Sequence, residues 1–153
     1  MAVMNNSQNP RNNRKKMNCR KPADRRPYME QETKFYAGND QKSILKLIKG
    51  SDIPQGLQEL CAEMKEGAGE KHLPVAELEQ NKVVVKVGSV FHPMLEEHSI
   101  EWVYLKTEKC EQLMYLKPGG DPVAEFALLP GDKPVCVYAY CNLHGLWKLP
   151  LHG

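Results

Sequence analysis

The sequence contains no long apolar run. Nowhere in its 153 residues is a stretch long and apolar enough for a membrane-spanning helix or for the middle of a signal peptide. We therefore expect a soluble protein that stays in the cytoplasm. With 41% hydrophobic residues, the chain can still form a modest core, and its length suits one domain of ordinary size with appendages.

The cysteines lack the paired spacing of a disulfide framework. Their number, five, is odd. Thiols that stay free, as in a reducing cytoplasm, remain available for a metal. We therefore expect no disulfide among Cys19, Cys61, Cys110, Cys136 and Cys141.

The beginning of the chain is short of acidic and large apolar side chains. Among its first thirty residues, only Asp24 and Glu30 oppose a cluster of Arg and Lys. Because such a segment buries too little surface to offset the entropy of ordering, residues 1–33 are expected to form a disordered basic tail. The charge would suit nucleic acid, but no aromatic residue precedes Tyr28 to stack on bases. Nucleic acid is therefore not expected as a partner.

After Gly69 the sequence changes to short runs rich in β-branched and aromatic residues, separated by turn signals such as Pro118-Gly119-Gly120-Asp121. Strands at near-regular spacing without intervening helices indicate an antiparallel sandwich. In the last run, alternation places Val135, Val137, Ala139 and Cys141 on one core-facing row. The expected strands are Val75–Leu78, Lys82–Val87, Ile100–Lys106, Gln112–Leu116, Val123–Leu129 and Val135–Cys141.

One cysteine and several histidines are candidates for a metal site. Cys141 and His144 stand three residues apart where a strand would turn, so a thiolate and an imidazole can face one ion. The pair alone also fits a half-buried cysteine beside a surface histidine. Three further histidines precede it, and His152 in the C-terminal tail is left over. The three are His72, His92 and His98.

These residues lie in three motifs, in the order E-K-H-x-P, H-P-M with E-E-H after it, and C-N-x-H-G-x-W. The set resembles the iron-binding domain of superoxide reductases, the desulfoferrodoxin and neelaredoxin family, over roughly residues 68 to 148. The resemblance implies an immunoglobulin-like antiparallel β-sandwich of about seven strands over residues 68–153. It also implies one mononuclear non-haem iron, Fe2+ or Fe3+, bound by His72, His92, His98, Cys141 and His144.

Four imidazole nitrogens and one thiolate form a five-donor set if they converge. Structural zinc prefers four ligands, and blue copper would leave two histidines unexplained. The residues alone indicate a transition metal with five ligands, and the choice of iron comes from the family. A metal with an open position does chemistry, and the reaction that the family implies is one-electron reduction of superoxide to hydrogen peroxide in oxidative stress defence.

The resemblance also assigns roles to the two residues before His72. Lys71 would attract the superoxide anion and help to organise water for protonation. Glu70 would occupy the open position of the oxidised iron. In an arbitrary sequence the same dipeptide would be a solvated surface pair.

Residues 34–67 are similar to the small desulforedoxin-like domain that some members of the family carry. That domain holds a second iron with four cysteines. In this chain, Cys61 is the only counterpart of those four cysteines. Because one thiolate cannot saturate a tetrahedral iron site, we expect one iron per chain. Cys61 would then be a small buried or half-exposed residue, and Glu59–Lys65 would form a short helix.

Two hypotheses follow for the function. The first is a one-iron superoxide reductase, and the second is a non-catalytic iron-binding or electron-transfer module on the same sandwich. Glu70 and Lys71 favour the enzyme, because a storage site does not require them. The family further implies a small redox donor such as rubredoxin, and a homo-oligomer, either a dimer or a tetramer.

The remaining polar and aromatic residues have ordinary structural interpretations. Asn142 is expected to cap backbone groups, while neighbouring amides hydrogen-bond the Cys141 sulfur. The other expectations are core or rim positions for Trp102 and Trp147, exposed carboxylates for Glu96 and Glu97, and structural thiols for Cys110 and Cys136.

Overall fold

The computed structural model describes residues 33–40, 42–50, 52–64 and 71–151. All regular elements in these ranges are strands. No helix among the described residues is long and apolar enough to cross a membrane. Disorder was expected for residues 1–33. Residues 1–32 lie outside the described ones, and Thr33 is buried.

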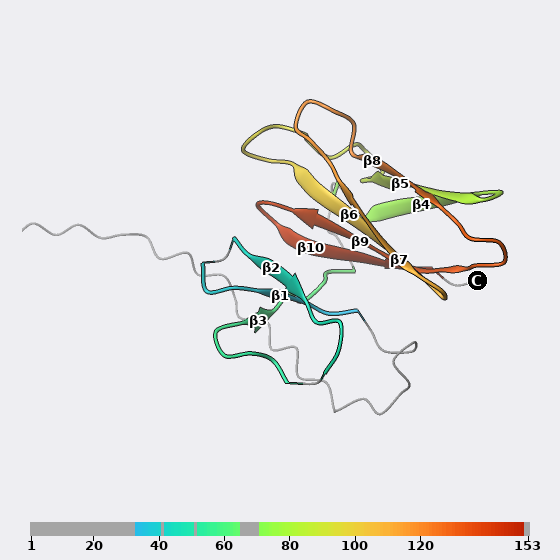
Figure 1. The fold of residues 1–153 in the computed structure, drawn as a ribbon. Coiled ribbons are helices and arrows are strands. Elements are labelled where there is room, and N and C mark those ends of the chain that lie inside the picture. Colours follow the sequence, from blue (N-terminus) through green and yellow to red (C-terminus); the bar gives the residue numbers. More distant parts are fainter. Residues whose placement is uncertain (1–32, 41, 51, 65–70, 152–153) are drawn as a thin grey trace, which may run out of the picture.

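Seven strands form a sandwich of two antiparallel sheets, in the orders β10-β9-β6-β7 and β4-β5-β8. Figure 1 shows these sheets as the two upper layers of the molecule. The predicted all-β, immunoglobulin-like sandwich of about seven strands is thereby confirmed. Its strands are β4 (Pro74–Glu79), β5 (Lys82–Val87), β6 (Ile100–Thr107), β7 (Glu111–Tyr115), β8 (Val123–Ala127), β9 (Pro134–Cys141) and β10 (Gly145–Pro150).

The main core lies between these two sheets. Strand β5 contributes Val83, Val85 and Val87, each at most 1% exposed. Strand β9 contributes most of the expected row: Val137, Ala139 and Cys141 are fully buried. The expectation is wrong for Val135, which lies near the start of β9 and is 37% exposed. Cys141 therefore ends a rigid core-facing row at one end of the sandwich.

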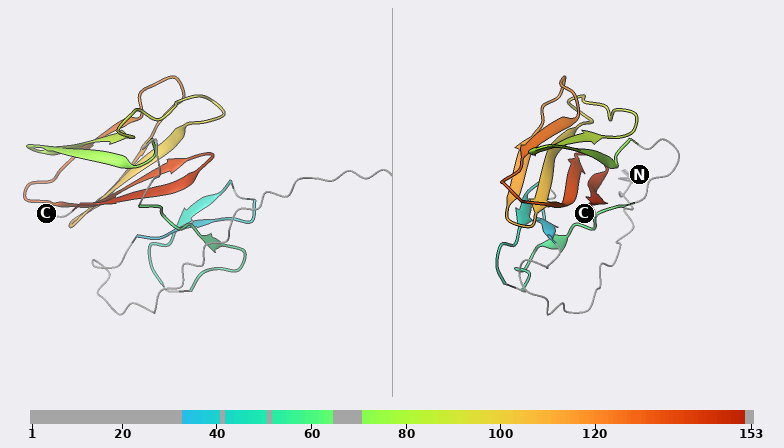
Figure 2. Two further views of the ribbon diagram at one scale, coloured as in Figure 1. Left: turned by 180° about the vertical axis from the view of Figure 1, so that it is seen from behind. Right: turned by 90° about the vertical axis from the view of Figure 1, so that its right-hand side faces the viewer.

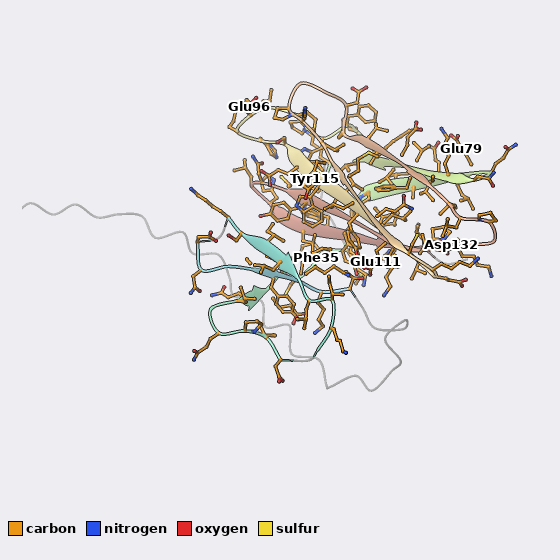
Figure 3. All side chains as sticks on the ribbon, in the orientation of Figure 1. Phe35, Glu79, Glu96, Glu111, Tyr115 and Asp132 are labelled. Carbon is orange, nitrogen blue, oxygen red and sulfur yellow. The ribbon has the colours of Figure 1, made fainter. Side chains whose placement is uncertain are left out.

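Three short strands cover the outer face of the four-stranded sheet. They are β1 (Phe35–Ala37), β2 (Ile44–Lys46) and β3 (Gln58–Glu59), in the order β2-β1-β3. Phe35 projects from this small sheet (Figure 3), and its ring lies 5.2 Å from the rings of Trp102 and Tyr104. The views from behind and from the side in Figure 2 show the same order of layers. Strand β9 is consequently buried on both faces, with Cys136 and Tyr138 on the outer one.

Three further expectations need correction. Gln58–Glu59 is a strand and Glu63 forms a β-bridge, so no helix forms over the described part of Glu59–Lys65. Strand β10 was not expected; it follows the tight turn at Gly145 and pairs with β9 along its whole length. The expectation of free thiols throughout is also wrong, because Cys61 is disulfide-bonded. Cys110, Cys136 and Cys141 are not disulfide-bonded.

Candidate metal centre

Three loops at one end of the sandwich carry the candidate ligands. His72 precedes β4, and His92 and His98 lie between β5 and β6. Cys141 is the last residue of β9, and His144 lies in the three-residue turn to β10. Gly145, with φ +82°, completes this turn in the left-handed conformation that such hairpin loops use.

The loops are tied to one another by backbone hydrogen bonds. Leu95 and His98 each donate an amide hydrogen bond to the other's carbonyl. The Gly88 amide donates to the Leu73 carbonyl at 2.9 Å. A Cβ at Gly88 would lie 2.6 Å from the Lys71 carbonyl oxygen, so glycine permits the close approach that places His72.

The Cys141 turn is also tied to the neighbouring loop. The Asn142 side-chain oxygen accepts a hydrogen bond from the Ser99 amide at 3.0 Å, and the Asn142 amide donates to the Ser99 carbonyl at 3.1 Å. Each partner is adjacent in sequence to a candidate ligand. The expectation that Asn142 caps backbone groups is confirmed, although its partner could not be read from the sequence.

Five candidate donor atoms gather at this end, all within 4.8 Å of one another. They belong to His72, His92, His98, Cys141 and His144. The four imidazoles are arranged in a square, and the centroids of neighbouring imidazoles are 4.5 to 4.9 Å apart. The His72 and His98 rings are 6.2 Å apart, as for opposite corners. The histidines thus form a four-sided ring beside the buried Cys141 sulfur, which lies 3.6 Å from Nδ1 of His144.

Burial and hydrogen bonds prepare His92 to donate an electron pair. Its Nδ1 donates a hydrogen bond to the Pro93 carbonyl, which leaves Nε2 with the lone pair. Burial, and to a smaller extent the neighbouring imidazoles, lower the pKa of His92 to about 4, against the effect of that hydrogen bond. The ring is therefore neutral near pH 7, as metal binding requires.

The thiol of Cys141 is buried in the same end of the core. Burial raises its pKa, while hydrogen bonds from the backbone amides of His144 and Leu143 act in the opposite direction. Those amide bonds are of the kind expected from the sequence. They stabilise negative charge on the sulfur, which is the form that binds metal.

The donor set fits a transition-metal ion. Nε2 of His92 and Nε2 of His98 are buried without a hydrogen-bond partner among the described residues, an arrangement that is costly unless something else binds them. Two nitrogens about 2.1 Å from one ion and at a right angle lie about 3 Å apart. The separation of His72 Nε2 and His144 Nδ1 is 2.8 Å.

The remaining candidates differ in their exposure to solvent. Lys71 is exposed beside His72, and Glu96 and Glu97 are exposed as expected. Trp102 and Trp147 are core residues, each 8% exposed. Glu70 lies outside the described residues. The indole of Trp147 stacks on the His72 imidazole, a contact that no pattern in the sequence predicts.

The fold and this site define an all-β protein with a candidate five-donor transition-metal centre. A family model described as Desulfoferrodoxin matches residues 64–150. The chain belongs to the desulfoferrodoxin family.

Individual relatives agree with this membership. A desulfoferrodoxin homolog from Archaeoglobus fulgidus is 54% identical over 79 residues, 52% of this chain and 62% of that protein. A desulfoferrodoxin from Clostridium acetobutylicum is 34% identical over 78% of this chain and 98% of its own length. The superoxide reductase from Treponema pallidum has a similar solved structure, with TM-score 0.66, 37% identity, and coverage of 77% of this chain and 98% of that chain. The chain spans somewhat under two thirds of three curated relatives.

Proposed function

We propose that this protein is a superoxide reductase, which reduces superoxide to hydrogen peroxide at one mononuclear non-haem iron. The observation that carries the proposal is the ring of four imidazoles beside a buried thiol, with two buried Nε2 atoms lacking partners. His72, His92, His98, Cys141 and His144 would bind the iron. The names of family members, including the Treponema pallidum superoxide reductase, support the same activity.

Iron in this donor set would supply one electron at a time by cycling between Fe2+ and Fe3+. Per superoxide, the reaction consumes one electron from an external reductant and two protons, and it yields one hydrogen peroxide. This balance separates the activity from that of a dismutase, which needs no external electron and also releases oxygen.

The residues around the ring differ in access to solvent. Cys141 is fully buried, whereas His144 and Lys71 are exposed. A small anion therefore reaches the site from the side of His144 and Lys71. The Lys71 ammonium would draw superoxide to that side, and Glu70 would be the carboxylate that closes the site after oxidation.

The activity can be measured on the full chain loaded with Fe2+ under anaerobic conditions. Mixing the reduced protein with superoxide from pulse radiolysis should give one hydrogen peroxide per superoxide and no oxygen. One oxygen and one peroxide per two superoxide would indicate dismutation instead. Iron binding without any reaction would favour the alternative, a non-catalytic iron-binding or electron-transfer module.

The family also suggests partners and location. We propose a small redox protein such as rubredoxin as electron donor, a homodimer or homotetramer as the assembly, and the cytoplasm as the compartment. Light scattering of the purified chain would test the assembly. Reduction of the oxidised protein by added rubredoxin, followed optically, would test the donor.

A further inference from the structure

Trp147 makes an aromatic contact with one proposed ligand. Its indole stacks on the His72 imidazole, with ring centroids 4.8 Å apart and an interplanar angle of 15°. Trp147 is 8% exposed, and its Nε1 is buried without a hydrogen-bond partner among the described residues. An unpaired buried N–H is unfavourable, so the indole N–H does not stabilise this position. The favourable contact of Trp147 with His72 is made by its flat ring.

The stacked ring matters because His72 is held differently from the other ligands. Cys141 ends a central strand, and the loop of His98 is closed by its reciprocal bonds with Leu95. His72 instead lies in the stretch before β4. A parallel indole restricts rotation of its imidazole, and the orientation of that ring decides where the Nε2 lone pair points.

The N-terminal segment reaches the backbone on either side of Trp147. The Glu63 amide donates to the Leu146 carbonyl at 2.9 Å, and the Glu63 carbonyl accepts from the Lys148 amide at 2.8 Å. Glu63 thereby forms a parallel bridge opposite Trp147, on the outer edge of β10. The bridge thus supplies hydrogen-bond partners for the Leu146 carbonyl and the Lys148 amide on this strand edge, where backbone groups commonly lack them.

The bridge connects this edge to the small N-terminal sheet. Three residues before Glu63, the Leu60 amide donates to the Phe35 carbonyl at 2.8 Å, and Phe35 is packed on the outer face of the sandwich. Nine positions after Glu63 the chain arrives at His72. The same segment therefore braces the strand that carries Trp147 and leads into the ligand that Trp147 contacts.

We propose that Trp147 is a positioning residue for His72, and that the N-terminal segment, through the Glu63 bridge, holds Trp147 in place. The segment that lacks the cysteines for a second iron would thus support the remaining metal centre. This inference rests on the proposed function of the five residues as a metal site.

The first test compares Trp147→Leu with Trp147→Phe in the full chain, using Co2+ and, anaerobically, Fe2+ as probes. Chelator competition gives the dissociation constant, and the visible spectrum of the Co2+ form reports the ligand arrangement. Trp147→Leu should bind Co2+ about tenfold more weakly, in the range known for outer residues that orient ligands. Trp147→Phe should keep most of the affinity because it keeps a stacked ring.

A double-mutant cycle separates positioning from general destabilisation. In a His72→Ala background, Trp147→Leu should have no further effect on Co2+ affinity, because the ring it orients is gone. Equal weakening in both backgrounds, or equal affinities for the Leu and Phe variants, would overturn the proposal.

The second test concerns the bridge and remains informative if Trp147→Leu does not fold. Glu63→Pro removes the amide that donates to Leu146, whereas Glu63→Ala keeps the backbone bond. Only the Pro variant should weaken Co2+ binding and alter the visible spectrum. Unchanged binding in Glu63→Pro would contradict the role of the N-terminal segment. Failure of the parent chain to bind either metal would instead refute the proposed function.

Discussion

The two ends of the sandwich bury polar groups in opposite ways. Figure 3 marks the ends by Glu96, in the loop that carries His98, and by Asp132. The Asp132 carboxylate accepts hydrogen bonds from the Thr107 hydroxyl at 2.6 Å and from the amides of Lys109 and Lys133. At the other end, Nε2 atoms of His92 and His98 are buried without partners in the described structure.

This difference distinguishes a structural cluster from a binding site. A buried polar group without a partner costs about 1–3 kcal/mol, so two such atoms within one cluster of candidate ligands support the proposed metal site. The Asp132 end is complete without any ligand, because its buried oxygens and amides satisfy one another. At the His92 end, the proposed iron would accept the lone pairs of these nitrogens.

The largest expected effect is that of Cys141→Ser at the metal end, with a cysteine-to-serine change at the Asp132 end as its control. Cys141→Ser replaces a soft thiolate with a hard, mostly protonated hydroxyl. We expect loss of superoxide reduction and of the thiolate-to-iron charge-transfer band in the oxidised protein. Cys110→Ser is the matched control, because its thiol lies 3.6 Å from the Asp132 carboxylate, and it should keep both. A parent rate in Cys141→Ser would show that this thiolate is not a ligand.

Lys71→Ala tests the exposed side of the metal end. Removal of the charge should slow the reaction of the reduced protein with superoxide by about one to two powers of ten, since electrostatic steering acts in this range. Its rate should also depend less on ionic strength. Pulse radiolysis at several salt concentrations measures both, with the exposed Lys117→Ala as control. A parent rate with the parent salt dependence would argue against guided capture of the anion.

Asp132→Ala tests the end of the sandwich at which the buried polar groups hydrogen-bond one another. Loss of the carboxylate removes the acceptor of the Lys133 amide and one of the acceptors of the Thr107 hydroxyl and the Lys109 amide. The free energy of unfolding should therefore fall by about 1–3 kcal/mol. Metal affinity should stay at the parent value. Denaturant unfolding and chelator competition measure the two quantities. A large loss of metal affinity would mean that the two ends are not independent.

The pH dependence of this cluster has a definite sign. Burial alone would raise the pKa of Asp132, but the hydrogen bonds from Thr107, Lys133 and Lys109 together outweigh burial and hold the pKa below 3.8. A carboxyl with a lowered folded pKa contributes stability above its unfolded pKa and loses it as the pH falls through the folded pKa. The stability difference between parent and Asp132→Ala should therefore shrink below about pH 3.8. A constant difference down to pH 2 would contradict this.

The smallest expected effect is that of Asn142→Ala. This change removes the side-chain acceptor of the Ser99 amide and should destabilise the metal-free protein by about 1 kcal/mol. Because Asn142 and Ser99 flank two proposed ligands, metal affinity should fall with stability, unlike in Asp132→Ala. Parallel unfolding and chelator titrations test the contrast. A loss of stability with parent metal affinity would make this pair structural only.

The sequence was most informative where one local pattern determined the structure. Alternation in β9 correctly placed Val137, Ala139 and Cys141 in the core, but it also placed Val135 there, which is exposed near the start of the strand. It did not indicate that Cys136 and Tyr138 on the opposite face are buried as well, because that depends on the small sheet that packs there. Motif spacing likewise suggested one common site, and the structure brings those five side chains together.

The errors arose where distant segments decide the outcome. Glu63 reads locally as part of a short helix, but the edge of β10 offers it backbone partners and it becomes a bridge. The disulfide at Cys61 depends on which segments meet in space, and spacing along the chain does not reveal this. The stacking of Trp147 on His72 joins residues 75 positions apart in the sequence.

A single iron with a thiolate ligand at one end of the sandwich can be detected by metal analysis combined with the optical spectrum of the oxidised full chain. We predict one iron per chain and a thiolate-to-ferric charge-transfer band that disappears in Cys141→Ser. Two irons per chain, or one iron without that band, would contradict such a site.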